Sequence, residues 1–273
     1  MAHILIKFVA RLQKTKSEMN NIDEYFEHRQ TVRQYSDKPI EPELLNHMIE
    51  AAANAPTTGG MQLYSVVVTT SPEMKRRLAP CHFNQPMVTD AAAVLTFCAD
   101  FNRFEKWCVQ SGAKPGFRNF ESLVSAMLDA TIVAQQFNTI AELNGLGCCY
   151  IGTTTYNAQQ IAQVLELPQM VVPVVTLTVG YPSPEAKDAI KAERLPLSAI
   201  VHSEKYRDYT PADITAAYAE KERLEVNRQF VKDNGKQSLA QVFTDVRYPQ
   251  STSDTYSRLL RDFIAAQGYA FPE

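Results

Sequence analysis

The hydrophobic positions of this chain follow two spacings, and each spacing predicts one kind of element. Apolar residues at helical intervals predict four helices with an apolar face, over 20–33, 41–56, 119–144 and 253–271. A more polar helix is predicted over 211–233, and a loop over 233–252. Short β-branched and apolar runs predict strands over 63–70, 91–100 and 171–182. Because helices and strands alternate irregularly and not as βαβ units, the pattern predicts an α+β fold with a helix-flanked mixed sheet.

The segment 119–144 is apolar nearly all round, which predicts a helix buried on most sides. Ala126, Ala130 and Ala134 follow one another at intervals of four, so they form a smooth stripe that lets another element approach closely. Packing within one chain and packing in a dimer interface explain this stripe equally well.

Length, charge and cysteine content narrow the class of protein. The 273 residues suffice for one large core or two modest domains. A net charge of −3 argues against a nucleic-acid partner, and no apolar run approaches the roughly 20 residues that span a membrane. Five cysteines without a C-x-x-C pair favour a reducing, cytoplasmic location with buried thiols.

Residues 1–19 form a basic, mildly amphipathic N-terminal extension interrupted by Lys7 and Arg11, which argues against a secretory signal. Three alternatives stay open for it: a disordered tail, a weak transit-like segment, or a true start at Met19.

Common catalytic motifs are absent, including the P-loop, the G-x-S-x-G elbow and H-E-x-x-H. The stretch GLGCCYIG (145–152) ends a helix and leads into a strand, the reverse of a dinucleotide-binding loop. Cys148 and Cys149 within it are expected to be packing residues. The scattered histidines are expected to be structural and no metal site is predicted; they are His3, His28, His47, His82 and His202.

The stretch HRQTVRQYSDKPI (28–40) is the first candidate for chemistry. Arg29 and Arg33 are four residues apart near the end of the predicted helix 20–33, so they are expected to share one helical face, with Thr31 between them. They form either a solvated basic surface or a cationic clamp for phosphate.

Four separated stretches become coherent when they are taken together: RQTVRQY (29–35), APTTGGMQ (55–62), GLGCCYIG (145–152) and ERLPL (193–197). With them the chain resembles the nitroreductase family of flavoproteins, most closely its NADPH-preferring, flavin-reductase-like branch. The resemblance implies a three-layer homodimer with a mixed or antiparallel sheet and two FMN sites at the subunit interface. Residues 20–205 would form the FMN-binding domain, and residues 206–273 a helical extension over the active site and the interface.

The resemblance also implies roles for individual residues. Arg29, Gln30 and Thr31 would face the FMN phosphate and ribityl chain, and Arg33 would reach the N1–O2 edge of the flavin. Arg194 would complete the phosphate clamp, helped by Lys191 in place of a family lysine. The other expected contacts are Thr57 and Thr58 with the flavin of the partner subunit, Gln85 with the pyrimidine edge, and Tyr150, Ile151, Gly152 and Thr153 beneath the ring, where a main-chain N–H near Gly152 would donate to N5.

The activity implied is a ping-pong transfer of hydride from NADPH or NADH through flavin N5 to a small-molecule acceptor such as a nitroaromatic, a quinone or a flavin. No catalytic side chain is required, because the cofactor performs this chemistry. The alternatives are a reductive dehalogenase on the same scaffold and a non-catalytic FMN-binding protein. Five basic residues lie on the predicted helix after residue 211 and in the loop that follows it: Lys221, Arg223, Arg228, Lys232 and Lys236. They either bind the 2′-phosphate of NADPH, as the resemblance implies, or form ordinary charge pairs.

Overall fold

The computed structural model of the chain describes residues 22–188 and 193–271. The described residues fall into two compact units, the first made of 22–188 with 259–271 and the second of 193–258. The expected contact residue Lys191 lies outside the described residues.

A four-stranded antiparallel sheet with the strand order β1-β2-β4-β3 forms the centre of the first unit. The strands are β1 (Tyr64–Thr69), β2 (Ala93–Asp100), β3 (Gly147–Ile151) and β4 (Val171–Gly180). Their β-branched and apolar side chains suit a pleated, buried surface, and every residue of β2 is buried. The three predicted strands are therefore confirmed, and GLGCCYIG leads into β3 as expected.

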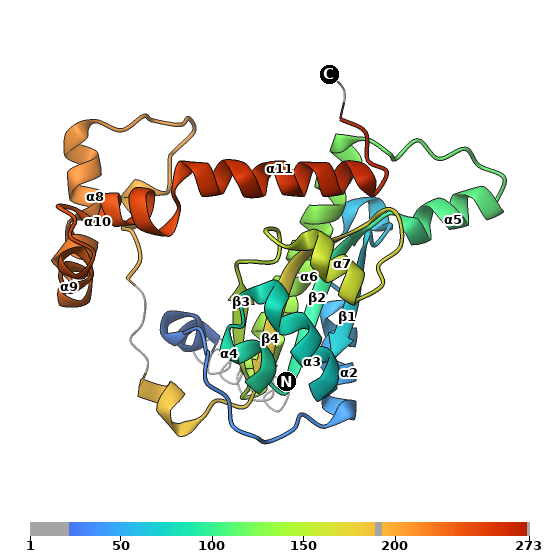
Figure 1. The fold of residues 1–273 in the computed structure, drawn as a ribbon, viewed down its shortest axis with the longest axis horizontal. Helices are drawn as coiled ribbons and strands as arrows, with labels where there is room; N and C mark the ends of the chain where they lie inside the picture. Colours follow the sequence, from blue (N-terminus) through green and yellow to red (C-terminus); the bar gives the residue numbers. More distant parts are fainter. Residues whose placement is uncertain (1–21, 189–192, 272–273) are drawn as a thin grey trace, which may run out of the picture. The chain divides into compact units, whose positions relative to one another are not determined.

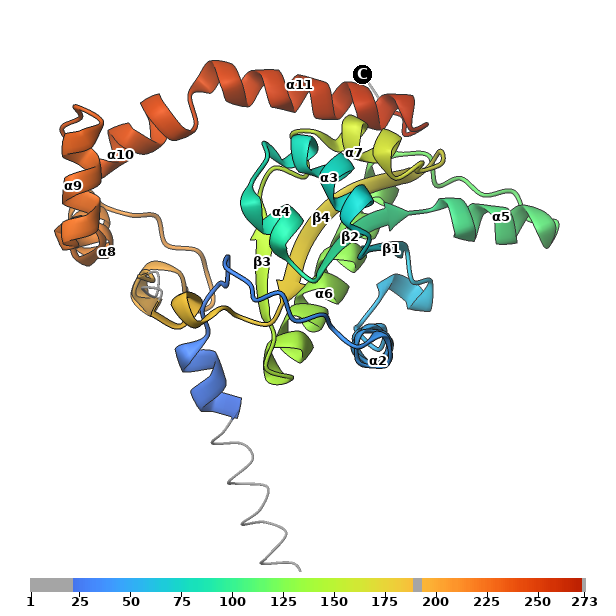
Figure 2. The same cartoon turned by 60° about the horizontal axis from the view of Figure 1, so that its bottom comes forward.

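Helices cover both faces of this sheet (Figures 1 and 2). On one face lie α2 (Pro42–Ala52) and α6 (Phe120–Leu143), and on the other α3 (Pro72–Leu78), α4 (Pro86–Asp90) and α7 (Ala158–Val164). Successive side chains of β2 point to opposite faces of the sheet, so each face has its own apolar core. Leu95 and Phe97 pack toward α2 and α6, while Val94 packs toward α3 and α7. The three layers confirm the predicted α+β class.

Helix α6 is the longest element, and it begins where the Asn119 side chain accepts a hydrogen bond from the Ser122 N–H at 2.9 Å. Ala126, Ala130 and Ala134 are all fully buried within the chain. The alanine stripe therefore brings α6 close to its own sheet and cannot form a dimer contact. No helix in the described ranges is long and apolar enough to cross a bilayer.

The predicted helix over 20–33 is too long, because the structure shows helix only over residues 22–28. The Val32 N–H donates instead to the Cys148 carbonyl at 3.1 Å, and the Ser36 N–H donates to the Tyr181 carbonyl at 2.9 Å. These long-range bonds hold residues 29–36 along the ends of β3 and β4. Arg29 and Arg33 therefore do not share a helical face.

Two further elements of the first unit are α5 (Asn102–Gln110) and the end of α11 (Gln250–Ala266), which confirms the last predicted helix. The second unit contains α8 (Pro211–Arg223), α9 (Glu225–Asp233) and α10 (Leu239–Gln241). The helix predicted over 211–233 is thus broken at Leu224, whose φ of −57° and ψ of 128° are not helical.

The loop predicted over 233–252 is also partly wrong, because α10 continues into a π-helix, Val242–Arg247. The Arg247 guanidinium lies 4.6 Å from the centre of the Phe230 ring, and the Phe243 and Tyr248 rings stack at 6.2 Å. Contacts among these side chains stabilise helical structure that the local pattern does not predict.

Two paired glycines leave space for residues 29–36 to pack on the sheet. Gly147 on β3 is the register partner of Gly180 on β4. A Cβ on Gly147 would lie 2.4 Å from the Cβ of Val32, and one on Gly180 would lie 2.9 Å from the Tyr35 ring. The absence of both side chains lets this segment pack directly on the strands.

Gly147→Ala should lower the free energy of unfolding by about 1–3 kcal/mol, because the added methyl overlaps Val32 in a close-packed site. Thermal unfolding of cofactor-stripped protein measures the change. The matched control is Gly152→Ala, whose added methyl meets no atom within 4 Å. A Gly147→Ala protein as stable as the control would show that Val32 can move aside.

Candidate functional site

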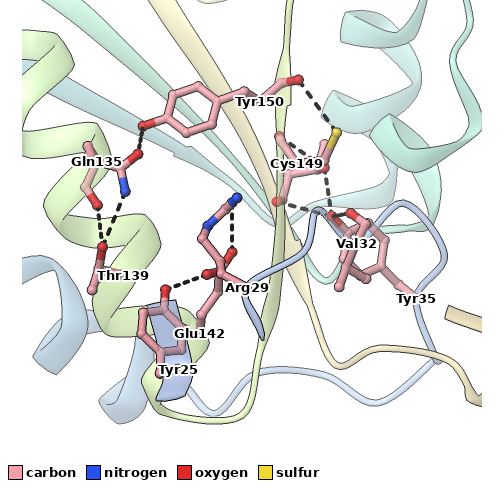
Figure 3. A network of polar contacts seen from close by, with 10 residues as sticks. Tyr25, Arg29, Val32, Tyr35, Gln135, Thr139, Glu142, Cys149 and Tyr150 are labelled. Carbon is pink, nitrogen blue, oxygen red and sulfur yellow. Dashed lines mark hydrogen bonds and ion pairs between the residues drawn. The ribbon is translucent and has the colours of Figure 1, made fainter. Parts of the chain in front are cut away.

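Arg29 lies directly after the helix 22–28 and is bound by the last turn of α6 (Figure 3). Its Nη2 donates to Glu142 Oε1 at 3.0 Å, and the Glu142 side chain is only 8% exposed. The Tyr25 hydroxyl donates to the other oxygen of the same carboxylate. Burial, together with this bond to Glu142, raises the pKa of Tyr25. One carboxylate thus anchors two residues from the N-terminal part of the chain.

Arg33 is exposed, and its positive charge lies near the buried thiol of Cys149 on β3. Burial raises the pKa of Cys149, while the charges of Arg33 and Arg29 partly oppose this effect. The two arginines are carried by an extended segment that docks on β3 through the Val32–Cys148 hydrogen bond, and not, as predicted, by one helical face.

The end of β3 presents main chain to the surface. Tyr150 is 38% exposed, and its hydroxyl donates to Gln135 Oε1 on α6 at 3.1 Å (Figure 3). Ile151 is buried, whereas Gly152 is exposed and the space around its α-carbon is open. A planar ligand can therefore approach the main chain here.

The turn after β3 is tied to the loop before α4. The Thr153 hydroxyl and His82 Nδ1 are hydrogen-bonded at 3.0 Å, and His82 is fully buried. Burial lowers the pKa of His82 to about 4, so the imidazole is neutral at pH 7. The Gln85 amide donates to the His82 carbonyl at 3.1 Å. The structure thus brings Gln85 and Thr153 together through a structural histidine, the role predicted for His82.

Thr57 and Thr58 both bind a carboxylate on α6 that the sequence pattern did not single out. Asp129 accepts from the Thr57 hydroxyl at 2.7 Å, the Thr58 hydroxyl at 2.8 Å and the Thr58 N–H at 2.9 Å. It also accepts from the Leu63 N–H at 3.1 Å. Burial by itself raises the pKa of Asp129, but these four hydrogen bonds hold it below its ordinary value.

Both threonine hydroxyl hydrogens are directed to Asp129, and the Thr57 oxygen also accepts from the Gln62 N–H at 2.8 Å, so the two hydroxyls can offer another partner only their remaining oxygen lone pairs. Their contact with the flavin of a partner subunit stays a prediction.

The remaining predicted contacts are spread over both units. Gln30 is half-buried, and its amide donates to the Ala186 carbonyl at 3.4 Å. Thr31 is half-buried beside it in sequence. Arg194 belongs to the second unit, where it lines a hollow with Glu220 and Lys221. Its place in a phosphate clamp therefore stays a prediction.

A larger hollow of about 700 Å³ lies within the second unit. Its wall combines aromatic and aliphatic side chains with cations, among them Tyr218, Leu239, Phe243, Lys221, Arg223 and Arg228. Three of the five cations considered for the nucleotide thus line one hollow. Lys236 instead pairs with Asp245 at 2.9 Å, as an ordinary charge pair does.

Comparison with known proteins decides the family. The model of the nitroreductase family matches residues 26–181, which is more than half of the chain. The chain belongs to the nitroreductase family. An FMN reductase [NAD(P)H] of Bacillus subtilis is 30% identical, over 92% of this chain and 98% of that protein. A Cr(VI) reductase of Pseudomonas sp. strain G-1 is 28% identical, over 91% of this chain and 98% of that protein. A solved structure from Bacteroides fragilis is 48% identical, with a TM-score of 0.88 over 91% of this chain and all of the other.

The residues at β3 of this nitroreductase-family chain suit an anionic, planar cofactor. Arg29 and Arg33 supply two guanidinium groups, of which that of Arg29 is paired with Glu142, and one guanidinium can engage two phosphate oxygens. Gly152 offers open main chain next to Thr153, which is tied through His82 to the Gln85 loop. The half-exposed Tyr150 adds an aromatic surface. These features fit FMN.

Sequence reasoning missed three residues of α6 that organise this site. Asp129 binds the 57–63 segment, Glu142 binds Arg29, and Gln135 binds Tyr150. All three lie on a helix that was considered only for its apolar positions. A carboxylate within a mostly apolar helix was the available signal, because a buried charge needs partners.

Asp129→Asn should lower the free energy of unfolding by about 1–3 kcal/mol at pH 7, because the amide nitrogen would face a donor and leave it unpaired. The pKa of Asp129 is lower in the folded state, so its carboxylate stabilises the fold above the unfolded-state pKa of about 4. That stability is lost as the pH falls through the lower folded-state pKa.

The difference in the free energy of unfolding between the wild type and Asp129→Asn should therefore become smaller below about pH 4. Denaturant unfolding at several pH values measures it, with the exposed Glu50→Gln on α2 as the control. A difference that does not change with pH would contradict the assignment.

Proposed function

We propose that this chain is an FMN-dependent NAD(P)H oxidoreductase that passes hydride to a nitroaromatic, quinone or flavin acceptor. The observation that carries the proposal is the docking of the arginine-bearing segment 29–36 on β3 through the Val32–Cys148 hydrogen bond, on the strand that leads to the open main chain of Gly152. The FMN reductase [NAD(P)H] among the relatives supports a reductase that uses a nicotinamide nucleotide, and the Cr(VI) reductase supports a reductase in general.

Bound FMN would supply the chemistry, which is to take up hydride at N5 from NADPH or NADH and release it to the acceptor. The residues of the chain bind and orient. Arg29, with Gln30 and Thr31, would hold the phosphate end. Arg33 would supply positive charge to the N1–O2 edge, which favours the reduced state. A main-chain N–H near Gly152 would donate toward N5.

The other contacts position the ring. The Gln85 amide would face the pyrimidine edge, while Tyr150, Ile151 and Thr153 would support the ring from beneath. Arg194 and Lys191 stay proposed as further contacts of the phosphate.

Neither His82 nor Cys149 has the shifted pKa that a nucleophile or a general base would need at pH 7. Burial keeps His82 neutral and raises the pKa of the Cys149 thiol, so the thiol stays protonated. A protein role limited to binding and orientation agrees with both properties. The five cysteines are free and buried, which supports a cytoplasmic location.

The active form is proposed to be a homodimer. Side chains at intervals of four along α6 form an exposed apolar stripe in the single chain: Phe120, Val124, Leu128 and Ile132. Leu128 is 56% exposed, which is unusual for one of a row of large apolar residues. The same helix carries Asp129, which fixes Thr57 and Thr58. A second copy packed on this stripe would bury it and bring the threonine loop near the other subunit's cofactor.

The purified protein should be yellow, and chromatography of its heat-released flavin should identify FMN. Oxidation of NADPH should accelerate when a quinone or nitroaromatic is added, because the acceptor regenerates the oxidised cofactor. Steady-state assays with and without each acceptor measure this.

Three results of these assays would contradict the proposal. Recovery of FAD would overturn the choice of cofactor. Bound FMN without turnover would indicate a flavin-binding protein, and turnover confined to halogenated substrates with halide release would indicate a dehalogenase.

Leu128→Glu should convert the dimer to monomer and lower FMN retention, because a carboxylate cannot be buried on an apolar stripe without a large desolvation penalty. Sedimentation and the flavin-to-protein ratio measure the two effects. Val68→Glu on β1, which introduces the same charge at an exposed apolar site, should remain dimeric. A monomeric wild type that retains FMN fully would show the interface assignment to be wrong.

A further inference from the structure

We propose that Glu142 is a positioning residue that orients Arg29 toward the cofactor phosphate and thereby makes the site prefer FMN to riboflavin. The inference rests on the proposed function, because it concerns the same cofactor. It adds a residue from α6 that takes no part in binding the flavin ring.

The contacts of its carboxylate hold Glu142 itself in place. Glu142 Oε1 accepts from Arg29 Nη2 at 3.0 Å, and its Oε2 accepts from the Tyr25 hydroxyl (Figure 3). The Glu142 side chain is 8% exposed and that of Arg29 is 22% exposed. Since the carboxylate is nearly buried and both of its oxygens are engaged, its own position is fixed. The guanidinium bound to it is fixed with it.

The position of Arg29 in the chain explains why such an anchor is needed. The helix 22–28 ends before Arg29, so neither helix nor strand restrains its side chain. Long side chains such as arginine lose more rotamer entropy than most others when they are ordered. A guanidinium already held by Glu142 has lost this freedom before the ligand arrives, and the cost no longer weakens ligand binding.

Arginine has enough hydrogen-bond donors to bind Glu142 and a phosphate at the same time. A guanidinium has five N–H donors in a fixed plane, and Glu142 engages it through Nη2. Other donors remain for phosphate oxygens, so Arg29 can hold both anions at once. Riboflavin has the same ring and ribityl chain as FMN but no phosphate. Loss of the anchor should therefore weaken FMN binding and leave riboflavin binding unchanged.

The test titrates flavin-stripped protein with FMN and, separately, with riboflavin, and follows the quenching of flavin fluorescence. Glu142→Ala should weaken FMN binding about tenfold, the size expected for one charge-assisted bond, with riboflavin affinity unchanged. Glu142→Gln keeps an acceptor oxygen and should recover part of the loss. Tyr25→Phe removes the second tether of Glu142 and should give a smaller loss of the same kind.

The ratio of the two affinities separates positioning from a merely structural role. Equal losses for FMN and riboflavin, in any of the three variants that folds, would show that Glu142 only maintains the fold and would overturn the inference. Tighter FMN binding by Glu142→Ala would overturn it too, because Glu142 would then be a competitor of the phosphate. Failure of the wild type to bind either flavin would instead refute the proposed function and the inference together.

Discussion

The candidate site depends on one contact, the docking of residues 29–36 on the β3–β4 pair. One of its hydrogen bonds runs from the Val32 N–H to the Cys148 carbonyl, and Gly147 leaves the space that Val32 fills. This docking ends the preceding helix and turns the chain into an extended path. The segment that bears both arginines then runs beside β3, although their helical spacing is lost.

Helix α6 organises the site from behind because a long, rigid helix can fix several distant segments at once. Its alanines bring it close to the sheet. Its polar residues then reach outward: Asp129 holds the threonine loop and Glu142 holds Arg29. Charges in a nearly dry environment are stable only when they are fully paired, which gives these two carboxylates defined geometries.

The two carboxylates illustrate different uses of a buried charge. Asp129 accepts four hydrogen bonds from a single loop, so its effect is local order and a lowered pKa. Glu142 accepts from Tyr25 and Arg29, and it joins the start of the described chain to the end of α6. The first stabilises a loop, and the second transmits the rigidity of a helix to a cation at the surface.

The sequence by itself determined the strands and the long helix, because β-branched runs and apolar periodicity act locally. It also determined the family, since the motif around Arg29 and the stretch 145–152 are local patterns that the family match confirms. The path of residues 29–34 was decided only by tertiary structure: helical spacing favoured one more turn, but the hydrogen bond of Val32 to a distant strand outweighs that preference. The partners of Asp129 and Glu142 were decided in the same way, because a pattern along the chain cannot show which distant donors a buried carboxylate will meet when the layers pack.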